Sequence, residues 1–124
     1  MKQNNRLAEG EYRFASLVWE HGAVPSGQLV ALAAEELGWK KSTTYTVLKK
    51  LCVCGILQNE NGTVTALVPR TAVQQEESAA VVERAFGGSL PQFVAAFLNQ
   101  KPITARDAEE IRAMLDAAKQ EEEP

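Results

Sequence analysis

The segment Trp39–Val68 constrains the fold of this chain more strongly than any other part. It reads WKKSTTYTVLKKLCVCGILQNENGTVTALV, in which a helix-forming stretch at 41–54 precedes a glycine and two β-prone stretches. Gly55 is placed to end the helix. The Asn61-Gly62 pair favours the positive φ angles of a tight hairpin turn. A polar helix followed at once by a β-ribbon is typical of a winged helix-turn-helix.

Two further helices are predicted upstream, over residues 9–20 and 26–37, with a turn at 22–25 between them. The two strands of the hairpin are expected at 56–58 and 63–68. Apolar side chains recur in all three predicted helices at the spacing of one helical face. The side chains expected to face the core are Phe14, Leu17, Val18, Leu29, Leu32, Ala33, Leu37, Thr44, Val47, Leu48 and Leu51.

The C-terminal part is also predicted to be helical, with helices at about 72–86, 89–100 and 104–118. The fold class is therefore mainly α with a small β-hairpin wing. We predict a winged-helix domain at 1–70 and a helical dimerisation domain at 71–124. The apolar faces of this second domain either pair with a second copy or pack on the chain's own winged helix. The side chains predicted to pack across the dimer are Val82, Phe86, Leu90, Phe93, Val94, Phe97, Leu98, Ile111 and Leu115.

The charge of the chain is unevenly distributed along its length. The net charge is −3, but residues 1–70 carry +2 and residues 71–124 carry −5. The acidity therefore lies in the second half, which leaves the first half able to meet phosphates. A surplus of +2 is weak evidence for nucleic-acid binding when taken alone.

The helix predicted at 41–54 has an unusual outward face. Opposite its apolar side it presents hydroxyl groups, and lysine pairs lie near both of its ends. Short hydroxyl side chains can contact base edges and phosphates, and lysines can contact the phosphate backbone. The alternative is a solvated helix face with no ligand. The residues predicted to contact DNA are Lys40, Lys41, Ser42, Thr43, Tyr45, Thr46, Lys49 and Lys50.

Several function classes find little support in the sequence. No apolar run approaches the length of a transmembrane helix and no secretory signal is present, so we expect a cytoplasmic protein without membrane insertion. Cys52 and Cys54 are too few for a metal site and are expected to be small apolar side chains. His21 is expected to contact a helix end. No catalytic motif is present, so we predict no enzyme, no cofactor and no metal.

The chain resembles the penicillinase and methicillin-resistance repressors, a family of winged-helix transcriptional repressors that includes copper-responsive members. The resemblance covers about residues 7–118. Glu11-Tyr12 with Val18-Trp19-Glu20 resembles the first helix of the family, and Trp39, Thr43, Thr46, Leu51 and Gly55-Ile56-Leu57 resemble its recognition helix. Phe86-Gly87-Gly88-Ser89 and Phe93-Val94-Ala95-Ala96-Phe97 resemble its dimerisation segment, and Ala108-Glu109-Glu110-Ile111 its last helix.

The resemblance implies a homodimer that binds a dyad-symmetric operator in double-stranded DNA. In the family, a membrane sensor protease triggers release of the repressor by cleavage, in some members between Asn and Phe. The corresponding bond here joins Ala96 to Phe97, so the residue before the cut differs. The cysteine cluster of the copper-responsive members is absent, and no metal site is carried over.

Two functional hypotheses follow from the residues and the resemblance together. The first is a sequence-specific repressor that acts as a homodimer and is inactivated by proteolysis. The second is a winged-helix module that binds another protein through its acidic half and has no affinity for duplex DNA.

Overall fold

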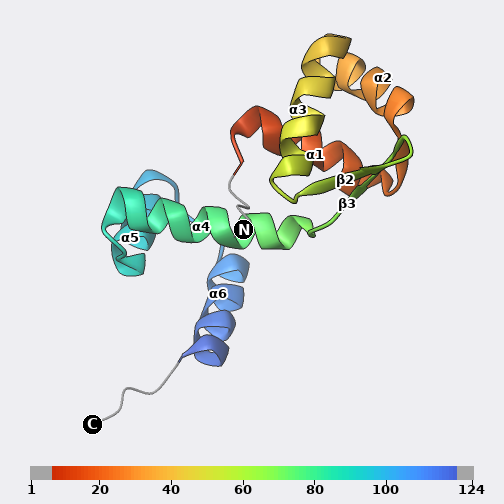
Figure 1. The fold of residues 1–124 in the computed structure, drawn as a ribbon. Helices are drawn as coiled ribbons and strands as arrows, with labels where there is room; N and C mark the ends of the chain where they lie inside the picture. The colour runs from red at the N-terminus through yellow and green to blue at the C-terminus, as the bar shows by residue number, and fades with distance from the viewer. Residues whose placement is uncertain (1–6, 120–124) are drawn as a thin grey trace. The chain divides into compact units, whose positions relative to one another are not determined.

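The computed structural model describes residues 7–119, which form six helices and three short strands (Figure 1). The fold class predicted from the sequence, mainly α with a small β-hairpin wing, is confirmed. The elements, in chain order, are α1 (Glu9–His21), β1 (Val24–Pro25), α2 (Ser26–Leu37), α3 (Lys41–Val53), β2 (Leu57–Glu60), β3 (Thr63–Ala66), α4 (Arg70–Phe86), α5 (Leu90–Gln100) and α6 (Ala105–Ala118).

The described residues form two compact units that divide between Val81 and Val82, inside α4. This division lies further along the chain than the predicted domain boundary after residue 70. The outer ends of the two predicted domains, 1–6 and 120–124, lie outside the described residues.

The sheet has the strand order β1-β3-β2, with both pairs antiparallel. At the hairpin turn Asn61 and Gly62 have φ angles of 54° and 86°, the positive values that the Asn-Gly pair predicts. The amide N–H of Gly62 donates to Asn59 Oδ1 over 3.1 Å and fixes the turn.

The strand β1 corrects one expectation, because the sequence indicated only a turn at residues 22–25. Val24 pairs with Val64 and Pro25 pairs with Thr63, so this turn adds a third strand to the hairpin. A strand of two residues is too short to show the alternation by which strands are recognised.

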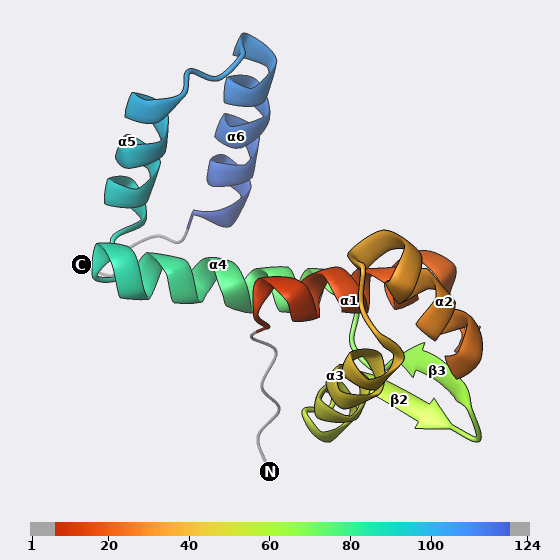
Figure 2. The same cartoon turned by 90° about the horizontal axis from the view of Figure 1, so that it is seen from above.

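The core of the first unit lies between α1, α2, α3 and the sheet, which surround it in Figure 2. The ring of Phe14 stacks on Trp39 with centroids 5.4 Å apart. Among residues 7–119, Thr44 is the one buried polar side chain, and its hydroxyl donates to the carbonyl of Lys40 over 3.1 Å. This hydrogen bond lets a hydroxyl occupy the core side of α3 without an unsatisfied donor.

The beginning of α4 belongs to the winged-helix unit for physical reasons. Val73 is buried in the same core as Phe14. The indole N–H of Trp19 donates to the carbonyl of Val68 over 3.0 Å, and the Arg70 guanidinium lies 5.4 Å from the centre of the Trp19 ring. These contacts attach the first turns of α4 to α1, which explains why the compact unit continues to residue 81.

The second unit contains the end of α4 together with α5 and α6. Phe86 and Phe93 meet edge to face across the Gly87-Gly88 turn, with centroids 5.5 Å apart. Ser89 and Thr104 cap α5 and α6, each accepting a hydrogen bond from the backbone three residues on. No residue of α5 or α6 is buried. Their apolar faces are therefore open.

Candidate nucleic-acid interface

Helix α3 is held so that one face enters the core and the opposite face meets solvent. Thr44, Leu48 and Leu51 are buried against α2 and the sheet. Every side chain that the sequence predicts to contact DNA is exposed, as the helical spacing requires. These residues are Lys40, Lys41, Ser42, Thr43, Tyr45, Thr46, Lys49 and Lys50.

The hydroxyl of Thr46 is already committed to one hydrogen bond. Its Oγ1 donates to the carbonyl of Ser42 over 2.9 Å, one turn earlier in the helix. A hydroxyl has a single proton, so Thr46 presents its oxygen lone pairs and its methyl group outward, and no donor. The side chain can therefore accept a hydrogen bond from a base amino group or contact a thymine methyl.

Lys50 differs from the other lysines of this face because it has an acidic partner. Its ammonium group forms an ion pair with the carboxylate of Glu11 on α1. The hydrogen bond that Lys50 donates within this pair holds the pKa of Glu11 below its ordinary value. The same hydrogen bond raises the pKa of Lys50. Glu11 also accepts a hydrogen bond from the backbone N–H of Ala8, which caps α1.

The remaining lysines of the face are differently placed. Within the described residues, Lys40, Lys41 and Lys49 have no ion-pair partner, so their ammonium groups are available to phosphates. The partner of Lys50, Glu11, was not among the residues predicted for this surface. The contact joins residues 39 positions apart, and no local pattern could have indicated it.

The wing lies beside α3, as Figure 2 shows for β2 and β3. Its turn, residues 59–62, contains Glu60 and no lysine or arginine, so the wing offers no positive charge to DNA. A hollow of about 400 Å³ lies at the surface where α3 meets β2, and Tyr45, Lys49 and Asn59 are among its lining residues. Cys52 lies in the same hollow, and burial raises the pKa of its thiol, which favours the unreactive protonated form.

The side chains that could bind a metal ion are the histidine, the cysteines and the carboxylates. Across residues 7–119, no three His, Cys, Asp or Glu side chains are placed to hold a metal ion together. His21 Nδ1 lies 2.8 Å from the carbonyl oxygen of Leu17, at the end of α1 where a helix-terminus contact was expected. In that same part of the chain, no helix is both long enough and apolar enough to cross a membrane.

The side chains predicted to form a dimer contact lie in the second unit in two environments. Val82, Phe86 and Phe93 are half-buried within it. The others are exposed on α5 and α6, with Phe97 at 50% and Leu115 at 55%. Ala96 and Phe97, which flank the predicted cleavage bond, are both exposed and lie inside α5.

The chain is similar in sequence to known proteins. The chain is 20% identical to the penicillinase repressor of Bacillus licheniformis over 123 residues, covering 96% of each protein. It is 25% identical over 120 residues to an uncharacterized 16.5 kDa protein in the ptsI 3' region of Latilactobacillus sakei, covering 94% of this chain and 82% of that protein.

A MarR-family transcriptional regulator from Silicibacter pomeroyi has a similar solved structure, with a TM-score of 0.44 and 22% identity. That match covers 94% of this chain and 76% of the other. The model of the penicillinase repressor family matches residues 7–117, nearly the whole described chain. The chain therefore belongs to the penicillinase repressor family and is a transcriptional regulator of the winged-helix type.

Proposed function

We propose that this protein is a sequence-specific repressor that binds a dyad-symmetric DNA operator as a homodimer. The observation that carries the proposal is the outward face of α3, on which hydroxyl groups and lysines are exposed together beside the wing. A dimer bound over a promoter would exclude polymerase. The protein would act in the cytoplasm, where its operator is.

The roles of the side chains follow from their chemistry. Lys40, Lys41 and Lys49 would contact phosphates, which position the helix without reading sequence. Thr46 and Ser42 would face base edges in the major groove. Because the wing has no lysine or arginine, most of the electrostatic attraction would come from α3 and its flanks.

A homodimer would make more DNA contacts than a single winged helix can make. A single module makes few contacts, and specific DNA-binding proteins gain affinity by reading two half-sites. The exposed apolar side chains of α5 and α6 form a surface that a partner would cover. We assign the homodimer contact to that surface, with Phe97, Leu98 and Leu115 among its members.

Proteolytic release is part of the proposal, with the bond between Ala96 and Phe97 as the site and a membrane sensor protease as the trigger. Both residues are exposed, but the bond lies inside a regular helix. A protease must bind its substrate in an extended form, so cleavage would require local unwinding of α5. A dimer that has lost this helix would release its operator.

The test is selection of binding sequences from a random duplex library, followed by anisotropy titrations of the selected DNA against a scrambled duplex. We expect an inverted repeat to emerge and to bind at least about a thousandfold more tightly than the scrambled DNA. No affinity for duplex DNA at low salt would contradict the proposal and favour the protein-interaction module. Selection of a single half-site would contradict the dimer.

A further inference from the structure

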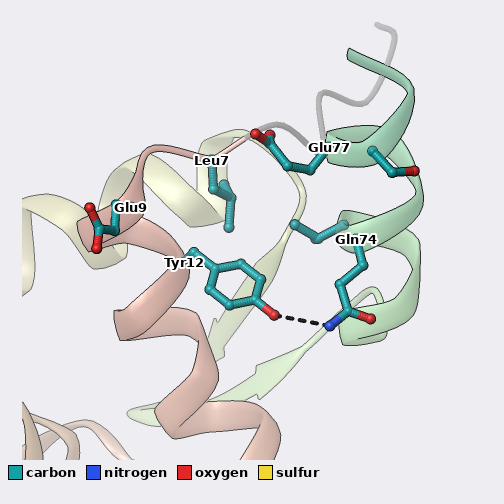
Figure 3. A pocket seen from close by; sticks show the side chains of 7 residues that line it. Leu7, Glu9, Tyr12, Gln74 and Glu77 are labelled. Carbon is teal, nitrogen blue, oxygen red and sulfur yellow. Dashed lines mark hydrogen bonds between the residues drawn. The ribbon is translucent and has the colours of Figure 1, made fainter. Parts of the chain in front are cut away.

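A pocket that the DNA-binding account does not use lies in the first unit, between the start of α1 and the first half of α4 (Figure 3). Its volume is about 450 Å³, within the range of roughly 300–1,000 Å³ typical of small-molecule sites. Leu7, Tyr12 and Val73 give it apolar walls. A site of this size fits a ring or a short alkyl chain.

Three of the side chains that line the pocket are held by contacts within the protein. Val73 is buried in the core, and Gln74 Nε2 donates to the Tyr12 hydroxyl oxygen over 3.3 Å. The Tyr12 ring also packs edge to face on Trp19, with centroids 5.5 Å apart. A pocket whose side chains are already held loses little freedom on binding, which favours affinity for even a small ligand.

Among residues 7–119, the charged side chains that line the pocket are acidic. They are Glu9 and Glu77, and no lysine or arginine of these residues lines it. Neither carboxylate has an ion-pair or hydrogen-bond partner among residues 7–119. Glu77 extends from α4 toward Leu7 (Figure 3). An ammonium group placed there would gain a charge-assisted hydrogen bond, and the Tyr12 ring could add a cation–π contact.

We infer that this pocket binds a small organic ammonium ion with an apolar body, the charged group at Glu77 and the body against Leu7, Tyr12 and Val73. A neutral ligand would gain no attraction to the carboxylate, and an anion would be repelled. One lining residue, Tyr12, is the neighbour in α1 of Glu11, which pairs with Lys50 of α3.

The test is calorimetric titration of the full chain with three probes of the same shape: 2-phenylethylamine, 2-phenylethanol and phenylacetate. We expect one amine per chain, bound about fivefold more tightly than the alcohol, since water weakens the attraction to an exposed carboxylate. Phenylacetate should not bind. Amines that carry a cyclohexyl or hexyl group in place of the phenyl ring should bind with similar affinity, because the apolar body contributes only hydrophobic contact.

Two substitutions in α4 test which carboxylate binds the ammonium group. Glu77→Gln keeps the shape and removes the carboxylate, so the amine should lose its advantage over the alcohol. Glu76→Gln removes the same charge from the neighbouring exposed position, which does not line the pocket, and should leave binding unchanged. Circular dichroism would establish that both variants remain folded.

The inference is overturned if none of the amines binds at millimolar concentration, if amine and alcohol bind equally, or if Glu77→Gln binds the amine as tightly as Glu76→Gln does. None of these measurements involves DNA. Failure of the ligand site would therefore leave the repressor proposal intact, and failure of DNA binding would leave the ligand site intact.

Discussion

Replacing Glu11 by glutamine should make DNA binding more dependent on salt, because it frees Lys50 to contact a phosphate. In the structure the Lys50 ammonium group is paired with the Glu11 carboxylate. The glutamine oxygen can still accept the hydrogen bond from the Ala8 N–H, so the cap of α1 is kept. The substitution therefore removes the ion pair with little change to the helix.

The magnitude follows from counterion release. Each phosphate contact adds about 0.9 to the slope of log affinity against log salt, so a dimer that gains two contacts gains about 1.8. From 50 to 200 mM salt, Glu11→Gln should lose roughly tenfold more affinity than the wild-type protein does. Lys49→Ala should do the opposite and lower the slope by about 1.8, because Lys49 has no ion-pair partner among residues 7–119.

Anisotropy titrations of the selected operator at several salt concentrations measure these slopes. Lys50→Ala should leave the wild-type slope nearly unchanged, and it should abolish the gain when combined with Glu11→Gln. Glu76→Gln serves as the charge-matched control, since it removes an exposed carboxylate from α4. If Lys50→Ala lowers the slope as much as Lys49→Ala does, Lys50 already contacts DNA and the restraint by Glu11 is refuted.

Three further predictions concern specificity, assembly and stability. Thr46→Val keeps a methyl and removes the hydroxyl acceptor, so selection on random DNA should show a changed preference at one position per half-site; an unchanged preference would remove Thr46 from base contact. Phe97→Asp should abolish dimers in sedimentation experiments, because it places a charge on the exposed face of α5, and dimers that persist would move the interface elsewhere. Leu51→Ala should lower the free energy of unfolding by about 2–5 kcal/mol in urea titrations, since Leu51 is fully buried; a loss under about 1 kcal/mol would contradict that burial.

The ion pair of Glu11 also makes stability depend on pH in a defined direction. The folded protein lowers the pKa of Glu11, so the pair stabilises the fold above the ordinary carboxyl pKa. That contribution should be lost as the pH falls through the lowered, folded pKa. Urea titrations should show a smaller acid-induced loss of stability for Glu11→Gln than for the wild-type protein. Equal losses would show that the pair does not contribute.

The helices and the hairpin could be predicted because their signals are local. Apolar spacing defined α1 to α3, and the Asn61-Gly62 pair defined the turn between β2 and β3. The same spacing correctly indicated which face of α3 is exposed. Two features depend on contacts between distant residues and could not be predicted this way. The strand β1 exists only because Val24 meets Val64, and Lys50 has its partner on α1.

The pocket could not be predicted from the sequence for the same reason. Its walls come from α1 and α4, separated in the sequence by the rest of the winged helix, so no motif marks it. The predicted domain boundary after residue 70 follows from Pro69, which ends the hairpin. The burial of Val73, which attaches the start of α4 to the first unit, has no counterpart in that local signal.

We expect the outward face of α3 to contact double-stranded DNA. Amide NMR spectra of isotopically labelled protein, titrated with the selected operator duplex, would report this contact residue by residue. The largest shifts and line broadening should occur at residues 40–50, with small changes in the wing. Shifts confined to α4 to α6, with residues 40–50 unaffected, would contradict it.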